Sequence, residues 1–160
     1  MKSISKELLL QLPKVELHCH LDGSLRVNSI LDQAKIDHIK LPFKNYDDLT
    51  AYFKIGENRG SLEDYIRRFD ITLCVMQTPK ALSRFAYELI EDVSRENVRY
   101  IEVRYSPILH TKKGMALEEA LESVRKGLKR GKKDFGVKSG IIVCGIRHIS
   151  PEASLKLADL

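Results

Sequence analysis

Two histidines that lie two residues apart, His18 and His20, are the residues in this sequence best suited to hold a metal ion. They fall in a stretch from Val15 to Asp22 whose alternation predicts a β-strand. Both imidazoles and the Asp22 carboxylate are therefore expected on one face. Neutral imidazole is a good ligand for Zn²⁺, and parallel α/β proteins build their sites at the carboxyl ends of strands. A bare His-x-His pair more often has a structural or surface role than a metal-binding one, so the spacing alone does not establish a metal site.

The strand that carries the histidines is expected to be one of three in an alternating α/β chain. Alternating or short apolar runs predict strands at residues 15–22, 98–105 and 140–146. Helical stripes and start signals predict helices at residues 24–36, 61–76, 79–96 and 117–134, and a last one from residue 150. Residues 37–60 lack a regular period and are expected to form a long connection. This order predicts a parallel sheet with helices packed outside it.

The composition is that of one globular domain over residues 1–160, with 43% hydrophobic and 31% charged residues. No apolar run approaches the roughly 18–20 residues of a membrane span, and residues 1–13 lack the features of a signal peptide. A cytoplasmic protein without a membrane partner is therefore expected. The three cysteines, Cys19, Cys74 and Cys144, are far apart, which favours buried free thiols over disulfides or a thiolate metal site.

The net charge of +5 arises between residues 112 and 138, where nine Lys or Arg outnumber four Asp or Glu by five. Leu117, Leu121, Val124 and Leu128 form the apolar side of the helix expected there. The basic side is therefore interpreted as a solvated helix face, with a phosphate-binding surface as the alternative. We expect no nucleic-acid partner.

Three segments match a known family in the order in which that family has them. Residues 13–24, which read PKVELHCHLDGS, resemble the opening strand of the adenosine deaminase family, a branch of the amidohydrolase barrels. Residues 97–107 are similar to its second strand, and residues 144–148 and 150–152 to its third. The resemblance covers nearly the whole chain and is weakest over residues 37–60. It implies the amino-terminal portion of a (β/α)8 TIM-type barrel, with about three parallel strands and an incomplete barrel.

The resemblance implies roles for three residues of the opening strand. His18 and His20 would bind Zn²⁺, one ion per complete site, and His20 would also lie against the bound nucleoside. Asp22 would accept a hydrogen bond from the ribose 5′-hydroxyl, with a helix-start acid as the alternative. Adenine deaminases of the same superfamily have glutamate at this place, so aspartate favours a nucleoside over the free base.

The helix that begins at Ser61 is the second substrate-binding element that the resemblance implies. The positions expected to wall the purine pocket and exclude water from it are Leu62, Tyr65, Ile66 and Phe69. A helical stripe of this kind also serves simply to bury a helix in a core. That remains the alternative for each of the four residues.

Three further polar residues near strand ends are given structural roles. Glu102 and Arg104 could reach the barrel interior, but a structural ion pair is the favoured interpretation. His148 is expected to be a packing or hydrogen-bonding residue rather than a metal ligand.

The reaction implied is zinc-dependent hydrolytic deamination of adenosine or deoxyadenosine, as in purine salvage. Zinc lowers the pKa of its bound water toward about 7, which makes hydroxide available. The family's catalytic glutamate and aspartate are expected downstream of Leu160, since their motifs are absent from these 160 residues. Two histidines fall short of the three protein ligands usual in a catalytic zinc site. We therefore expect the chain alone to bind zinc weakly, to be inactive and to need the missing carboxyl-terminal half.

Two other interpretations of function remain open. The chain could be a non-catalytic fragment that binds a metal, which zinc content measured beside an adenosine assay would reveal. It could instead belong to a deaminase of a related purine, such as adenine, AMP or a modified nucleoside, which a panel of substrates would identify.

Overall fold

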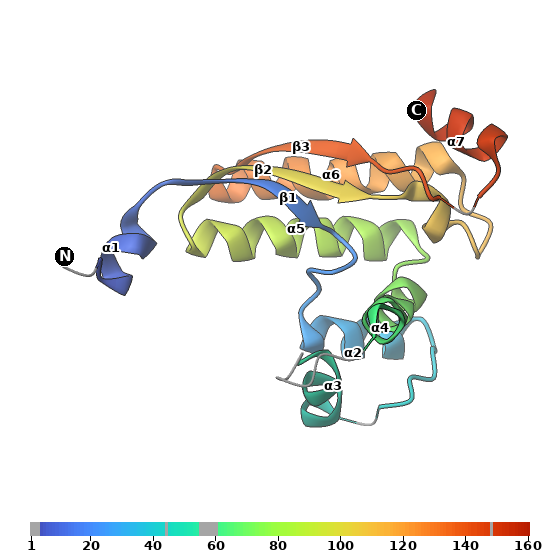
Figure 1. Cartoon of the computed structure of the whole chain (residues 1–160), viewed down its shortest axis with the longest axis horizontal. Coiled ribbons are helices and arrows are strands. Elements are labelled where there is room, and N and C mark those ends of the chain that lie inside the picture. Colours follow the sequence, from blue (N-terminus) through green and yellow to red (C-terminus); the bar gives the residue numbers. More distant parts are fainter. Residues whose placement is uncertain (1–3, 44, 55–60, 148) are drawn as a thin grey trace.

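A computed structural model describes residues 4–43, 45–54, 61–147 and 149–160, and at its centre is a parallel three-stranded sheet (Figure 1). The strands are β1 (Lys14–His20), β2 (Val98–Tyr105) and β3 (Lys138–Val143). Their order is β1-β2-β3, so β2 is the central strand and the histidine-bearing β1 is an edge strand. Three parallel strands alternating with helices confirm the α/β class expected from the sequence.

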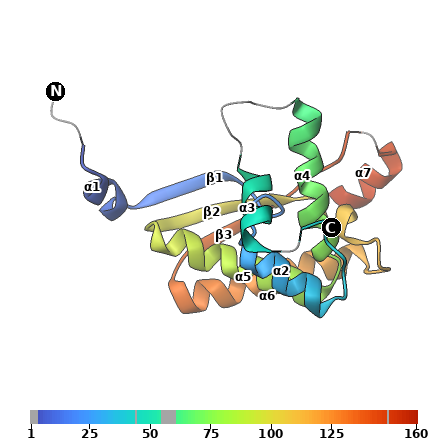
Figure 2. The same ribbon diagram turned by 90° about the horizontal axis from the view of Figure 1, so that it is seen from below.

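The described ranges also contain seven α-helices and one 3₁₀ helix. They are α1 (Lys6–Gln11), α2 (Val27–Ile36), α3 (Tyr46–Phe53), α4 (Leu62–Val75), α5 (Pro79–Arg95), η1 (Pro107–His110), α6 (Leu117–Phe135) and α7 (Pro151–Ala158). Helices α5 and α6 lie side by side along one face of the sheet (Figure 1), whereas α1 projects away from it and buries no residue (Figure 2). None of the helices described is both long enough and apolar enough to cross a membrane.

The best-buried part of the molecule is β2 with the two helices that cover it. Ile101, Val103 and Tyr105 alternate along β2 and are at most 1% exposed, because every second residue of a strand shares a face. Helix α6 approaches α5 so closely that a Cβ added at Gly131 would lie 2.6 Å from the Cβ of Ile90. A glycine at this position therefore permits the close contact between the two helices.

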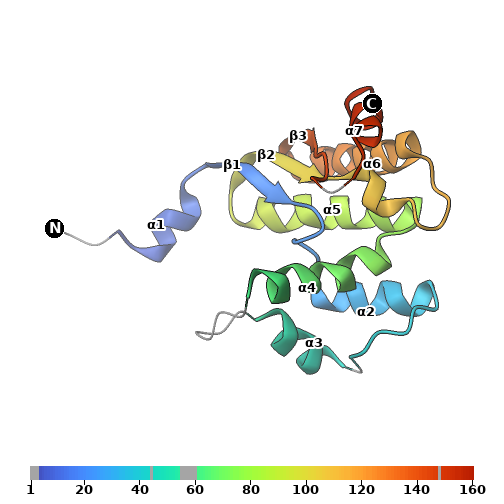
Figure 3. The same cartoon turned by 45° about the vertical axis from the view of Figure 1, so that its right-hand side comes forward.

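Helices α2, α3 and α4 form a second group beyond the carboxyl end of β1 (Figure 3). The prediction of an irregular connection over residues 37–60 is wrong at residues 46–53, which form α3. The Asn45 side chain begins this helix by accepting a hydrogen bond from the backbone N–H of Asp48, at 2.9 Å, and Leu49 is fully buried. One cap and one buried leucine are too short a pattern for periodicity to detect. Residues 44 and 55–60 lie outside the described residues.

Several element boundaries also differ from their predicted positions. β1 ends at His20 rather than at residue 22, α2 begins at Val27 rather than at residue 24, and α1 is not predicted at all. β3 spans residues 138–143 instead of 140–146 because pairing with β2, from Tyr100 to Tyr105, sets its length. A hydrophobic run in the sequence indicates that a strand is present, but the ends of that strand depend on its pairing with a neighbouring strand.

Candidate metal and nucleoside site

His18 and His20 lie side by side at the carboxyl end of β1, as their spacing predicts. Their ring centroids are 5.4 Å apart and the ring planes are tilted by 41°. The ring of His20 also approaches that of Phe69, with centroids 6.4 Å apart. Both histidines are exposed, and the side chain of His20 retains 49% of its accessible surface. Two accessible imidazoles at this separation can offer nitrogen ligands to one cation.

These two donors fit part of a zinc site. No group of three His, Cys, Asp or Glu residues within the described ranges is arranged to hold a metal ion. Asp22 lies beyond the end of β1, with its Oδ1 3.8 Å from Nδ1 of His20. A catalytic zinc ion usually has three protein ligands. His18 and His20 can therefore supply two ligands of such a set.

The carboxylate of Asp22 is buried and has an unused acceptor. The residue is 7% exposed, and its Oδ1 has no hydrogen-bond partner within the described parts of the chain. Burial raises the pKa of Asp22 above its usual value, while the neighbouring His20 and the backbone N–H groups of Asp22 and Gly23 oppose that rise. A buried acceptor without a donor is unfavourable. This oxygen is therefore suited to receive a hydrogen bond from a ligand.

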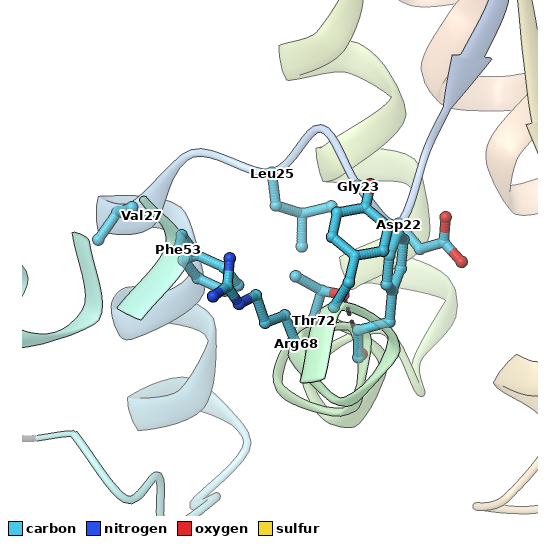
Figure 4. Close-up of a pocket in the computed structure, with 9 residues that line it drawn as sticks. Asp22, Gly23, Leu25, Val27, Phe53, Arg68 and Thr72 are labelled. Atoms are coloured by element: carbon cyan, nitrogen blue, oxygen red, sulfur yellow. Dashed lines mark hydrogen bonds between the residues drawn. The ribbon is translucent and has the colours of Figure 1, made fainter. Parts of the chain in front are cut away.

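Helix α4 brings an aromatic wall to the end of β1. Ser61 begins the helix with a capping box, which satisfies backbone N–H groups at its amino end. Tyr65 and Phe69 follow one turn apart, with ring centroids 5.7 Å from each other. Both line a cavity of about 240 Å³ together with Asp22 and Gly23, and Figure 4 labels the latter two. Two of the four predicted wall residues thus share a cavity with the predicted ribose acceptor.

The other two predicted wall residues are not placed at this cavity. Ile66 is 55% exposed and does not line it, because a residue next to Tyr65 points about 100° away around the helix. The side chain of Leu62 lies outside the described residues. A role for these two residues in substrate binding stays a prediction.

Residues that sequence reasoning did not single out complete the cavity lining. Arg68 and Thr72 of α4 and Phe53 of α3 are among them (Figure 4). Arg68 and Thr72 continue the helical stripe of Tyr65 at positions i+3 and i+7. Arg68 and Thr72 are polar, so the apolar pattern of the helix does not include them. Their helical spacing from Tyr65 alone would have predicted that they lie on the same face. Phe53 gives no comparable signal, since it belongs to a helix that the sequence did not predict.

Arg104 of β2 reaches across to β1 and contacts the first histidine. Its Nη1 lies 2.8 Å from Nε2 and 3.2 Å from Nδ1 of His18. The expected ion pair between Glu102 and Arg104 is wrong: Glu102 instead accepts a hydrogen bond of 3.2 Å from the hydroxyl of Tyr100. The pairing of β1 with β2 brings His18 within reach of Arg104, which strand alternation alone did not predict. His148 lies outside the described residues.

The fold and the histidine pair identify the broad structural class to which the chain belongs. A parallel strand that ends in two histidines, followed by strand and helix units with the helices outside, has the arrangement of the first part of a (β/α)8 barrel. A family model described as adenosine deaminase matches residues 13–160, and the chain belongs to the adenosine deaminase family.

Individual relatives agree with this assignment. An adenosine deaminase of Clostridium botulinum (strain 657 / Type Ba4) is 49% identical over 139 residues, which is 87% of this chain and 42% of that protein. The chain thus spans less than half the length of the curated relatives that it matches.

Two solved structures superpose on most of the chain. An adenine deaminase from Arthrobacter aurescens gives a TM-score of 0.81 at 26% identity, over 91% of this chain and 43% of that one. An amidohydrolase from Burkholderia ambifaria, with bound Zn, gives a TM-score of 0.82 at 25% identity, over 99% of this chain and 43% of that one. These superpositions confirm the partial-barrel fold.

Proposed function

We propose that this chain forms the first three units of a zinc-dependent adenosine deaminase, in which His18 and His20 hold the metal and Asp22 binds the nucleoside. The observation that carries the proposal is the pair of imidazoles, 5.4 Å apart, beside a buried carboxylate. Membership of the family supports a deamination reaction. In this proposal the reaction is hydrolytic conversion of adenosine or deoxyadenosine to the inosine product and ammonia.

Each residue of the chain has a separate task in this proposal. When bound, zinc would supply a water molecule whose pKa is lowered to about 7. His18 and His20 would hold and orient the ion, and Asp22 would accept a hydrogen bond from the ribose 5′-hydroxyl. That bond would fix the direction of the nucleoside and turn its base toward the histidines. Tyr65 and Phe69 would exclude water from one side of the purine.

The proton donor and the general base of the reaction are assigned in this proposal to the remaining part of the barrel. The described residues contribute two imidazoles, one fewer than the usual ligand set. The 160-residue chain alone is therefore expected to bind zinc weakly and to leave adenosine unchanged.

Deamination of a free base is the second candidate, because one superposed structure is that of an adenine deaminase. A free base has no 5′-hydroxyl, so it would leave the buried Oδ1 of Asp22 without a donor. The cost of an unsatisfied buried acceptor is about 1–3 kcal/mol. This cost favours a nucleoside as the substrate.

The test uses a complete barrel in which this chain provides the first three units. Replacing both His18 and His20 by alanine should remove bound zinc and lower adenosine turnover at least about a thousandfold. His38→Asn is a matched control, since His38 is exposed and has a φ of 52°, which asparagine tolerates. Zinc content and the absorbance change of adenosine are measured for each variant, and the control should match the parent.

The same barrel is then given adenosine, 5′-deoxyadenosine and adenine. Adenosine should be the best of the three substrates. Asp22→Asn should reduce the preference of the enzyme for adenosine over 5′-deoxyadenosine. Normal zinc content and turnover after loss of both histidines would contradict the metal assignment. A preference for adenine would instead identify the second candidate.

A further inference from the structure

A groove between α5 and α6, which lie side by side along one face of the sheet (Figure 1), is lined by basic residues from both helices. This basic groove has a volume of about 370 Å³, and its lining consists of Pro79, Lys80, Ser83, Arg84, Ser123, Lys126 and Arg130. Four of these seven residues carry a positive charge and none carries a negative one. The basic excess of residues 112–138 thus meets two further cations, from α5, in one groove.

Close packing of the two helices makes the basic groove narrow. A Cβ added at Gly127 of α6 would collide with the carbonyl oxygen of Ser83 in α5, so the two backbones meet at this point. Side chains three or four residues apart share one face of a helix. Lys80 and Ser83 therefore line one side of the groove. Lys126 and Arg130 line the other side, and the close packing directs both pairs toward the same space.

The positive charge of the basic groove is only partly neutralised by the acids of the described residues. Arg84 is paired with two acids, one on α2 and one on α5. Within the described ranges, no ion pair joins Lys80, Lys126 or Arg130 to a carboxylate. A cleft lined by charges of one sign concentrates ions of the opposite sign. The groove is therefore suited to bind an anion.

Two acids of α6 that lie near these cations are engaged by other side chains. Glu122 accepts two hydrogen bonds from Arg125, at 2.5 and 2.9 Å. Asp134 accepts a hydrogen bond of 3.1 Å from the hydroxyl of Tyr87. The guanidinium of Arg130 is stacked on the ring of Tyr87, with its central carbon 4.2 Å from the ring centroid. This stacking restricts the orientation of the guanidinium and holds it ready for a ligand.

The basic groove lies on the outer side of the helices. Lys80, Lys126 and Arg130 are exposed, whereas residues on the opposite side of the same helices, such as Leu82 and Val124, are fully buried. In a (β/α)8 barrel the helices form the outer ring. The groove would therefore remain accessible in a complete barrel, separate from the histidine pair on β1.

We propose that the basic groove is a binding site for a small anion with two linked phosphate groups, such as a diphosphate. Lys126 and Arg130 lie one turn apart, about 6 Å along the axis of α6. One phosphate group meets one of these cations closely, whereas two linked groups meet both. Lys80 contributes a third charge from α5, and ammonium and guanidinium groups both donate strong hydrogen bonds to phosphate oxygens. The inference does not depend on the proposed function.

The test is calorimetric titration of the metal-free 160-residue chain with sodium pyrophosphate and, separately, with inorganic phosphate, at physiological ionic strength. The parent should bind pyrophosphate more tightly than phosphate. The double variant Lys80→Gln with Lys126→Gln should bind pyrophosphate at least about tenfold more weakly, because it removes two charged donors. The double variant Lys129→Gln with Lys132→Gln is the matched control. It removes the same charge from exposed positions of α6 outside the groove and should change the affinity less than about twofold.

Nuclear magnetic resonance locates the anion without any change in the groove. The backbone amide signals of Ser83 and Lys126 should shift when pyrophosphate is added to the parent chain, and that of Asp70 on α4 should not. A variant with His18→Ala and His20→Ala should bind pyrophosphate as the parent does. Circular dichroism checks that each variant is folded.

Four results would overturn the inference. Equal affinities of the two lysine double variants for pyrophosphate would show that the groove is not the site. Equal affinities of the parent for phosphate and pyrophosphate would show that two linked groups are not recognised. Loss of pyrophosphate binding in the histidine variant would place the anion at β1. Tighter binding of a DNA duplex, weakened equally by both lysine double variants, would identify a basic helix surface for nucleic acid instead.

Discussion

Strands β1 and β2 are neighbours in one sheet, but their surroundings are opposite. β2 is central, and its alternate residues are buried beneath α5 and α6, with Ile101 fully inaccessible. β1 is an edge strand whose residues are mostly exposed, with Leu17 retaining 58% of its accessible surface. The chain therefore buries its second strand with its own helices, whereas the strand that carries His18 and His20 remains accessible.

Within this sheet, the strand that contributes most to the buried core is β2, whereas the strand that carries the candidate metal ligands is β1. An exposed edge with apolar side chains is unusual for a finished domain, because such edges tend to pair with further structure. In a barrel, the first strand would have a neighbour on each side. The packed layer of β2, α5 and α6 thus provides the scaffold, and β1 presents His18 and His20 from an exposed edge.

The largest expected effect comes from comparing truncations on the two strands. Ile101→Ala on β2 should lower the free energy of unfolding by about 3 kcal/mol, because it leaves a cavity in a closed core. Leu17→Ala on β1 should lower it by less than about 0.5 kcal/mol, because that side chain is already largely hydrated. Urea unfolding of both variants measures these changes. Equal losses in the free energy of unfolding would contradict the difference between the two strands.

An effect of at most similar size should appear as a pH dependence of the stability of the packed region. His110 is fully buried with Nδ1 3.0 Å from the carbonyl oxygen of Met76, and burial lowers its pKa to about 4. An unfolded histidine has a pKa of about 6.5, so the unfolded state binds more protons between these two pKa values. Stability should therefore fall as the pH is lowered from about 6.5 to about 4, by up to about 3 kcal/mol.

The His110 contribution can be isolated by urea unfolding at several pH values in that window. His110→Gln should flatten the dependence relative to the parent, since glutamine does not titrate. His38→Asn should preserve it, because His38 is exposed. A parent and a His110→Gln variant with parallel pH profiles would show that this buried imidazole is not the cause.

The smallest expected effect lies at the site itself and has the opposite sign. Burial raises the pKa of Asp22, so its charged form is disfavoured in the folded state and lowers stability as the pH rises above the ordinary value. Asp22→Asn should therefore increase the free energy of unfolding at pH 7, because it removes a charge that burial disfavours. Asp70→Asn removes an exposed acid from α4 and should be neutral. A destabilising Asp22→Asn would show that the carboxylate supports the fold.

Local patterns in the sequence were sufficient for several features of the fold and the site. The alternation of residues 98–105 predicted β2 with its observed bounds, and the stripe after Pro79 predicted α5. His-x-His on a strand predicted two imidazoles on one face, and the structure has their rings 5.4 Å apart. These features depend on neighbours two to four residues away, so side-chain periodicity is enough to predict them.

Contacts between residues far apart in the sequence determine features of the site and of the strand ends that local patterns do not predict. Arg104 meets His18 across 86 residues of sequence, and Phe53 of α3 joins Asp22 and Tyr65 at one cavity. Pairing with β2 sets β3 at residues 138–143, closer to the amino terminus than predicted, and β1 ends at His20, before Asp22. The sequence by itself thus determined the parallel α/β class and the histidine pair. Only the tertiary structure decided the cavity lining and the cation beside His18, because both depend on how separate elements pack.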